Sequence, residues 1–145
     1  MAKPFRITFT HRMSNLLMTT LVRAGVPLGN ISLLTIPGRK SGKPRTTPVL
    51  VRDYNGKRYL VAVYAVGDWV RNLRAAGSAT LTRGRRSETI GVVELSPEEG
   101  APILKADLNK AGASMILPYF DAKPESSLQE FAREAERHPV FQLRE

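Results

Sequence analysis

The sequence predicts an antiparallel α+β domain whose sheet closes into a small barrel, with helices between and after the strands. Two predicted hairpins support this fold class, because Asn55-Gly56 and Gly84 each separate two runs that are rich in β-branched residues. Helix-start patterns of the type Ser-x-x-Glu, at Ser96 and Ser127, then place helices after the hairpins. Strands joined in hairpins favour an antiparallel sheet, and closing that sheet removes its exposed edges.

The first expected element is an amphipathic helix with its lead-in, within residues 1–30. One face of this helix is largely apolar, several cations lie nearby, and Gly25 and Pro27 end it. Such a helix packs on its own domain or on a second subunit, or it lies on a membrane surface, and the pattern does not choose among these. The positions on the apolar face are Met13, Leu16, Leu17, Thr20, Leu21 and Ala24.

The central part of the chain is predicted to contain five strands and one short helix. Asp68 is expected to cap this helix, because its carboxylate can accept a hydrogen bond from the first turn, and Gly77 is expected to end it. The predicted strands cover residues 31–36, 47–52, 58–66, 78–83 and 87–95, and the helix covers residues 68–77.

The last third of the chain is predicted to be mainly helical. A capping box at Ser96 starts a helix that reaches about Ala111, and a second box starts a helix at Ser127. Residues 115–120 are apolar and aromatic without a clear period, and residues 140–143 read as a final strand. No repeat or linker divides the sequence, so residues 1–145 are predicted to form a single domain.

The chain carries a strong positive charge, with 22 Lys and Arg residues against 13 Asp and Glu and a formal net charge of +9. This balance favours nucleic acid, anionic lipid or an acidic small molecule as a partner. The absence of cysteine excludes disulfides and thiolate metal sites, and His11 and His138 have no metal-binding spacing. No apolar stretch approaches the roughly 20 residues of a spanning helix, so we expect a cytoplasmic protein.

The segment over residues 38–48 is the strongest candidate for a binding site. It holds four cations, three hydroxyls and two glycines in eleven positions. Arginine offers forked donors for phosphate or carboxylate, and glycine lets backbone N–H groups approach an oxyanion. A solvated loop is the alternative, but Pro44 and Pro48 within the segment and Pro37 just before it stiffen this part of the chain. It matches neither a P-loop nor a dinucleotide fingerprint, and it lacks the aromatic residues that nucleic-acid stacking needs, so nucleic acid is not the expected partner.

The run Leu34 to Pro48, with its core G-R-K-S-G-K-P-R, and the later W-V-R-N-L at Trp69 to Leu73 resemble the deazaflavin-dependent nitroreductase family. The resemblance covers about residues 33–93 and implies a split β-barrel of the FMN-binding kind that uses coenzyme F420. It also implies hydride transfer from the reduced deazaflavin to an electron-poor acceptor such as a quinone, an enone or a nitroaromatic compound. FMN in the same barrel, a carrier without turnover and a nucleic-acid-binding module are the alternatives.

The same resemblance implies roles for individual residues and allows a homodimer. Tyr64 and Tyr119 are the expected proton donors, with solvent as the alternative, and Tyr119 and Phe120 are expected to contact the acceptor. Residues 65–68 form a shorter loop than is usual in the family and lack its lysine, which removes one phosphate contact. For Trp69 a role as a core anchor is an equal alternative. The expected cofactor-binding residues are Arg39, Lys40, Ser41, Gly42, Lys43, Pro44, Arg45, Thr46, Thr47, Pro48, Ala62, Val63, Tyr64, Trp69 and Asn72.

Overall fold

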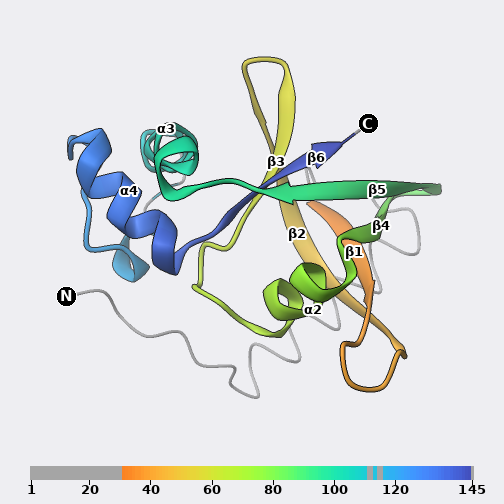
Figure 1. The fold of residues 1–145 in the computed structure, drawn as a ribbon. Coiled ribbons are helices and arrows are strands. Elements are labelled where there is room, and N and C mark those ends of the chain that lie inside the picture. Colours follow the sequence, from red (N-terminus) through yellow and green to blue (C-terminus); the bar gives the residue numbers. More distant parts are fainter. Residues whose placement is uncertain (1–30, 111–112, 114–115, 145) are drawn as a thin grey trace.

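A computed structural model describes residues 31–110, 113 and 116–144, and it confirms the α+β barrel (Figure 1). The expected amphipathic helix of residues 1–30 lies outside this part of the chain. The strands are β1 (Ile31–Pro37), β2 (Pro44–Tyr54), β3 (Lys57–Val61), β4 (Ser78–Arg83), β5 (Arg86–Glu94) and β6 (Val140–Arg144). The helices are α2 (Asp68–Ala76), α3 (Pro97–Leu108) and α4 (Leu128–Arg137), with one 3₁₀ turn, η2 (Leu117–Tyr119).

The six strands form a closed antiparallel barrel in the order β1-β2-β3-β6-β5-β4. Strand β1 closes it by pairing with β2 on one side and with β4 on the other. The last strand, β6, fills the gap between β3 and β5. Each of these six strands therefore has two neighbours, and none of them is left as an edge that could pair with another chain.

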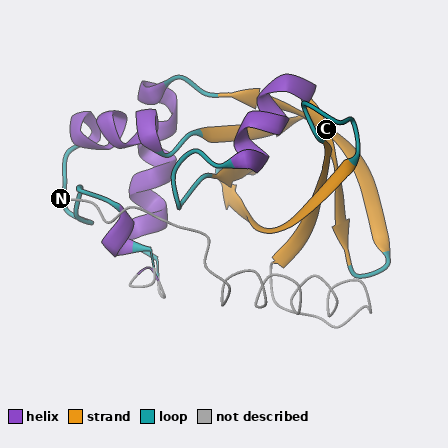
Figure 2. Ribbon diagram, turned by 90° about the horizontal axis from the view of Figure 1, so that it is seen from below, coloured by secondary structure: helices purple, strands orange, loops and turns teal. Residues whose placement is uncertain are grey.

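Two hydrophobic cores follow from the alternation of side chains along the strands. The inner core fills the barrel with residues such as Leu34, Leu60 and Phe141. The outer core lies between the barrel and helices α3 and α4, where Tyr59 and Phe131 pack together with their neighbours. Figure 2 shows these two helices gathered on one side of the barrel.

The barrel has two chemically different ends, which the strand register defines. The loop end carries the β1–β2 loop, the end of β3 and helix α2. The hairpin end carries the β2–β3 turn at Asn55-Gly56 and the β4–β5 turn at Gly84-Arg85. Because β1 pairs antiparallel to both β2 and β4, the β1–β2 loop and the β4–β5 turn lie at opposite ends of it.

The structure moves several predicted boundaries. Strand β2 begins at Pro44 rather than residue 47, because its pairing with β1 extends to the Pro37 and Pro44 pair. The residues from Pro44 to Pro48 are therefore strand rather than loop. Strand β3 ends at Val61 rather than residue 66. After Val61 the Ala62 N–H still reaches the carbonyl of Pro139, but a proline has no N–H with which to continue the ladder.

Two predictions about helix ends are also wrong. Gly67, not Asp68, is the N-cap of α2; Asp68 lies inside the first turn and makes no capping hydrogen bond. Helix α3 ends at Leu108 instead of Ala111, because the Asn109 side chain donates to the carbonyls of Lys105 and Pro124 and closes the helix there. The capping box at Ser96 is confirmed, and the Ser127 hydroxyl accepts from the Glu130 N–H as expected.

Candidate cofactor site

The β1–β2 loop at the loop end is closed by its own backbone. The Gly38 N–H donates to the Lys43 carbonyl at 2.8 Å, and the Gly42 N–H donates to the Gly38 carbonyl at 2.8 Å. Gly42 has a φ of +71°, which favours glycine. The two glycine amides are thus used inside the loop and do not face a ligand. The N–H groups of Lys40 and Ser41 have no partner within the described residues and are the ones left for an anion.

Helix α2 anchors this loop through one buried side chain. The Oδ1 of Asn72 accepts from the Arg39 N–H at 3.1 Å and from the Arg39 guanidinium at 2.9 Å. Asn72 is only 5 % exposed, so these bonds satisfy an amide oxygen that water does not reach freely. Asp68 adds a weaker ion pair to Arg39 at 3.5 Å. The residue pattern indicated no packing role for Asn72, but the structure assigns it one, because it fixes the conformation of the loop.

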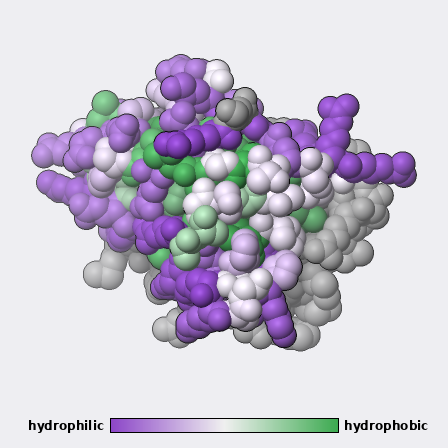
Figure 3. Space-filling view, turned by 45° about the vertical axis from the view of Figure 1, so that its right-hand side comes forward, coloured by the Kyte–Doolittle hydropathy of each residue, from purple (hydrophilic) through white to green (hydrophobic). Residues whose placement is uncertain are grey.

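Three other cations of the segment extend from this anchored loop. The side chains of Lys40, Lys43 and Arg45 are exposed and make no hydrogen bond or ion pair with the described part of the chain. Thr46 lies on β2, where its hydroxyl pairs with that of Thr35 at 2.9 Å. The face in Figure 3 has hydrophilic side chains at the left, at the bottom and at the upper right, with paler and hydrophobic surface between them. The exposed Lys40, Lys43 and Arg45 give the loop end a positive charge that faces solvent.

The chain after β3 brings the expected ring-contacting residues to the same end. Ala62 is buried and Val63 is half-buried. The chain then turns at Ala65, whose φ of +73° is unusual for a residue with a side chain, and its N–H donates to the Ala62 carbonyl. Tyr64 lies within this turn and is 39 % exposed. Helix α2 starts at Asp68, three residues after Ala65, so the turn leads directly into the helix that anchors the β1–β2 loop.

Tyr64 and Tyr119 come together although they are far apart in sequence. Their ring centroids are 5.0 Å apart at an interplanar angle of 85°, which is an edge-to-face contact. Burial raises the pKa of the Tyr64 phenol, the nearby Tyr119 raises it further, and Arg52 opposes the shift. The Tyr64 hydroxyl is thus protonated at neutral pH and can donate a hydrogen bond.

A buried histidine, His138, contacts both the residue after β3 and the segment that carries Tyr119. Nδ1 of His138 lies 2.9 Å from the Ala62 carbonyl, and Nε2 lies 3.0 Å from the Tyr119 carbonyl. The ring stacks on Phe120 with centroids 3.9 Å apart. Burial lowers the pKa of His138, while the two carbonyls and the carboxylate of Glu134 oppose that shift. His138 therefore links the end of β3 to the η2 turn beneath the tyrosine pair, a buried contact that its lack of metal-binding spacing in the sequence did not indicate.

Glu134 completes this support, although no sequence pattern had singled it out. Its side chain is buried, and Oε1 accepts from the N–H groups of Asp121 and Ala122 at 2.7 Å each. Arg137 pairs with the other oxygen at 3.0 Å. The spacing of Glu134 and His138, four residues apart on one helix, was a signal that could have found this pair.

The two remaining aromatic candidates are partly or wholly in the cores. Trp69 is half-buried against the inner core, with its ring 6.2 Å from that of Phe141. Phe120 is 6 % exposed and packs in the outer core, so the bulk of its ring faces the protein. Neither placement tests a contact with cofactor or acceptor, and both roles stay predictions.

The described residues fit an anionic cofactor by the chemistry of their donors. One helix ties together an anchored cationic loop and a turn that carries a paired tyrosine. Every buried side-chain polar atom of the described residues has a partner, so the fit rests on the exposed cations and the two amides of the loop. Arginine and lysine donors of this kind, with Arg39 anchored by Asn72, suit phosphate and carboxylate groups. The fold and this end of the barrel are therefore suited to a ligand that carries phosphate or carboxylate groups.

Comparison with models of protein families identifies the family of this chain. The model of the F420H(2)-dependent quinone reductase family matches residues 9–114, which is more than half of the chain. The chain belongs to this family, and it is therefore an oxidoreductase that uses reduced coenzyme F420. The match includes the whole basic segment and α2 and ends before Tyr119.

Solved structures share the fold. An F420-H2 dependent reductase, FDR-A, is 26 % identical over 79 % of this chain and 94 % of its own, with a TM-score of 0.51. A structure described as a domain-swapped dimer is 20 % identical over 94 % of this chain and 97 % of its own, with a TM-score of 0.56. A putative 5-nitroimidazole antibiotic resistance protein from Bacteroides thetaiotaomicron is 12 % identical over 86 % and 77 %, with a TM-score of 0.50.

A search of curated protein sequences finds no match. Among the described helices, none has the length and apolar character needed to cross a membrane.

Proposed function

We propose that this chain reduces an electron-poor organic acceptor, of the quinone, enone or nitroaromatic type, at the loop end of its barrel. The observation that carries this proposal is the cationic β1–β2 loop, which Asn72 fixes through two hydrogen bonds to Arg39. An anchored loop keeps its donors in place before the ligand arrives, which lowers the entropy lost on binding. Coenzyme F420 supplies the hydride when it is bound.

In this proposal the basic segment holds the acidic tail of the cofactor. Lys40, Lys43 and Arg45 provide the charge, and the N–H groups of Lys40 and Ser41, which have no partner among the described residues, provide directional donors. Arg39 contributes from its position on Asn72, since a guanidinium has five N–H donors and these contacts use only some of them. Thr46, Thr47 and Pro48 extend the site along β2, and Ala62 and Val63 border it from the end of β3.

The tyrosine pair is proposed to serve the acceptor. Tyr64 carries a protonated phenol at the surface, and its edge-to-face contact with Tyr119 limits its motion. A phenol held in this way can donate a hydrogen bond to a carbonyl or nitro oxygen and supply the proton that accompanies hydride transfer. The pair also covers part of the surface and so keeps water from the reacting groups.

The test of cofactor binding uses the three exposed cations of the basic segment. We expect oxidised F420 to bind the purified protein with micromolar affinity, about 8 kcal/mol, when followed by fluorescence. The triple variant Lys40→Ala, Lys43→Ala and Arg45→Ala is expected to weaken binding by about 100-fold, because each substitution loses a charged contact. Lys57→Ala removes one cation from the hairpin end and serves as the control.

Other outcomes of this titration separate the alternatives. Binding of FMN but not of F420 would contradict the cofactor assignment for this chain. Binding of F420 without turnover of any quinone or nitroaromatic acceptor would favour the alternative of a cofactor carrier without activity. Equal losses in the triple variant and in Lys57→Ala would mean that the basic segment is not the site.

Turnover tests the tyrosines separately. Tyr64→Phe and Tyr119→Phe keep the ring contact and remove one hydroxyl each. If Tyr64 donates the proton, Tyr64→Phe lowers kcat by roughly 100-fold with little change in F420 affinity. An unchanged kcat in both variants would assign the proton to solvent.

We propose a homodimer as the working assembly. The support is the relative described as a domain-swapped dimer, together with Leu50, which is 45 % exposed on β2. Light scattering on the purified chain tests this proposal, and a monomer at micromolar concentration would contradict it.

A further inference from the structure

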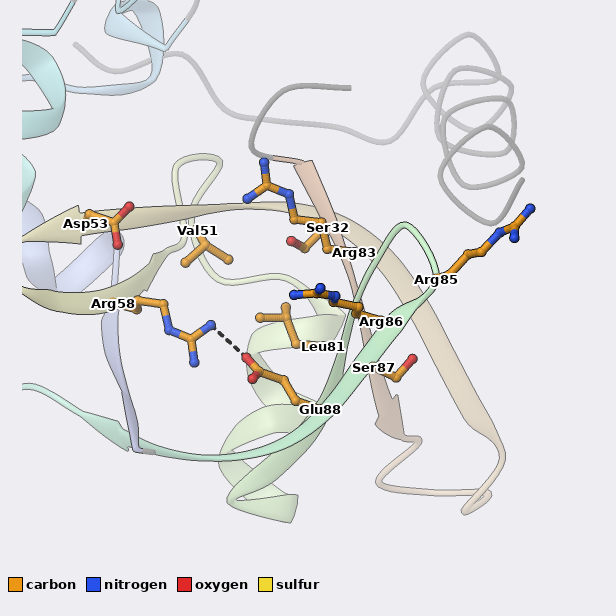
Figure 4. Close-up of a pocket in the computed structure, with 10 residues that line it drawn as sticks. All are labelled: Ser32, Val51, Asp53, Arg58, Leu81, Arg83, Arg85, Arg86, Ser87 and Glu88. Carbon is orange, nitrogen blue, oxygen red and sulfur yellow. Dashed lines mark hydrogen bonds and ion pairs between the residues drawn. The ribbon is translucent and has the colours of Figure 1, made fainter. Parts of the chain in front are cut away.

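The hairpin end of the barrel contains a hollow that the proposed function does not use. It has a volume of about 610 Å³ and contains none of the predicted cofactor or acceptor residues. Arg58, Arg83 and Arg86 line it, with Val51 and Leu81 as apolar lining (Figure 4). The mouths of β-barrels are a common place for small-molecule sites, and this volume is within their usual range.

The hollow is built from the inward-facing positions of the strands. Along each strand the inner core is apolar, and the next inward position toward the hairpin end, two residues away, is polar. This change occurs in five neighbouring strands, so the polar groups surround one mouth. The changes are Leu34 to Ser32, Val51 to Asp53, Leu60 to Arg58, Leu81 to Arg83 and Ile90 to Glu88.

The charges in this mouth are divided unevenly. The two carboxylates lie beside Arg58: Glu88 pairs with it at 2.7 Å, and Asp53 lies opposite it in the β2–β3 register. Arg83 and Arg86 instead lie directly opposite each other in the β4–β5 register, on the inward face. With Arg85, the described lining holds four arginines against two carboxylates, so the hollow carries a net positive charge that favours an anion.

The arginine side chains around the hollow differ in their orientation. Figure 4 shows Arg58 and Arg86 extending toward each other near Leu81, whereas Arg85, which also borders the hollow, extends its guanidinium outward from the turn. Forked guanidinium donors suit the paired oxygens of a carboxylate or a phosphate, and the apolar lining suits a compact hydrocarbon body. Charge and shape therefore favour a ligand with both features.

We propose that the barrel mouth is a second ligand site, which binds an organic oxyanion consisting of a carboxylate or phosphate ester on a compact apolar body. Arg86 and Arg83 hold the oxyanion, and Val51 and Leu81 contact the body. The site is separate from the cofactor loop, because the two lie at opposite ends of β1.

Calorimetry with three probes tests this site: phenyl phosphate, benzoate and inorganic phosphate. We expect phenyl phosphate or benzoate to bind about tenfold tighter than inorganic phosphate, because only these two bury an apolar ring. Which of the two binds tighter identifies the oxyanion. The titrations are made on the wild-type chain and on Arg39→Ala, which alters the cofactor loop but is expected to leave the affinity for both ring-bearing probes unchanged.

A matched pair of variants in one hairpin separates a site from general charge. Arg86→Gln is expected to weaken binding about tenfold, whereas Arg85→Gln, with the same charge change, weakens it less than about twofold. The thermal midpoint of Arg86→Gln should stay close to that of the wild type, because Arg86 is exposed and surface substitutions change stability little. Equal losses in the two variants, equal affinity for the three probes, or loss of binding in Arg39→Ala would each overturn the proposal.

Discussion

The two ends of the barrel both carry positive charge, but they hold it in different ways. At the loop end, Arg39 is tied to Asn72 and the other cations point outward without protein partners among the described residues. At the hairpin end, the arginines project inward around a hollow and share it with two carboxylates. The first arrangement suits a long polyanion that lies on the surface, and the second suits a small ligand that enters the barrel.

The comparison teaches that net charge does not locate a site. Both ends contribute to the formal charge of +9, and only the backbone decides which side chains converge. At the loop end a buried amide and a buried histidine fix the geometry. At the hairpin end the strand alternation alone does so. The two ends should therefore respond differently to substitution.

The largest effect on stability is expected from His138→Phe. This change removes the ring nitrogens that face the Ala62 and Tyr119 carbonyls in a buried position. We expect the free energy of unfolding to fall by about 3 kcal/mol, because the neutral ring donates to one of these buried carbonyls and phenylalanine leaves that carbonyl without its donor. Urea unfolding measures this, and His138→Gln, which retains an N–H donor, should recover part of the loss. An unchanged midpoint in urea would show that His138 does not support the loop end.

Asn72→Ala should have the next largest effect. The loss of two hydrogen bonds to Arg39 leaves the β1–β2 loop without its anchor and costs about 2 kcal/mol of unfolding free energy. F420 affinity should fall as well, by about tenfold, because a mobile loop loses more entropy on binding. The control is Asn72→Asp, which keeps an oxygen for Arg39 and should restore stability. Wild-type stability in Asn72→Ala would contradict the anchoring role.

The pH dependence of stability should reveal the buried imidazole. Burial lowers the pKa of His138 below its ordinary value of about 6.5, so the unfolded chain binds a proton more readily than the folded one. The unfolding free energy contributed by this group is present above about pH 6.5 and is lost as the pH falls through the lowered pKa. Glu134 and the cation of Arg137 face the same ring and act in opposite directions.

Thermal unfolding between about pH 5 and 8 measures this dependence. Subtracting the profile of His138→Gln isolates the contribution of the imidazole. A difference profile in which the imidazole stabilises the fold more at low pH would contradict a lowered pKa for His138.

The smallest effect is expected at the hairpin end, from Glu88→Gln. Its ion pair with Arg58 is short, but the Glu88 side chain is about half exposed. Water screens such a pair, so the free energy of unfolding should change by less than about 1 kcal/mol. If the hollow binds an oxyanion, removing this carboxylate should instead raise the affinity for phenyl phosphate. A large loss of stability would mean that the ion pair, rather than the strands, holds this end closed.

The sequence predicted most turns and helix starts because each of them is determined by residues that are close together in the chain. The Asn55-Gly56 turn, the capping box at Ser96 and the cap at Ser127 each depend on residues within one turn of chain, and all are present. The end of β3 could not be predicted in this way, because it depends on Pro139, which is 78 residues from Val61. Residues 62–66 have strand propensity, and tertiary pairing overrides it.

The sequence by itself determined the basic segment, the hairpins and the family, because these depend on residue chemistry at short spacing. Only the tertiary structure brought Asn72 to Arg39, placed Tyr64 against Tyr119, and seated His138 beneath both. It also turned five polar inward positions on separate strands into one barrel mouth. These contacts join residues that are far apart in the chain, so they exist only once the barrel has closed and its register is set.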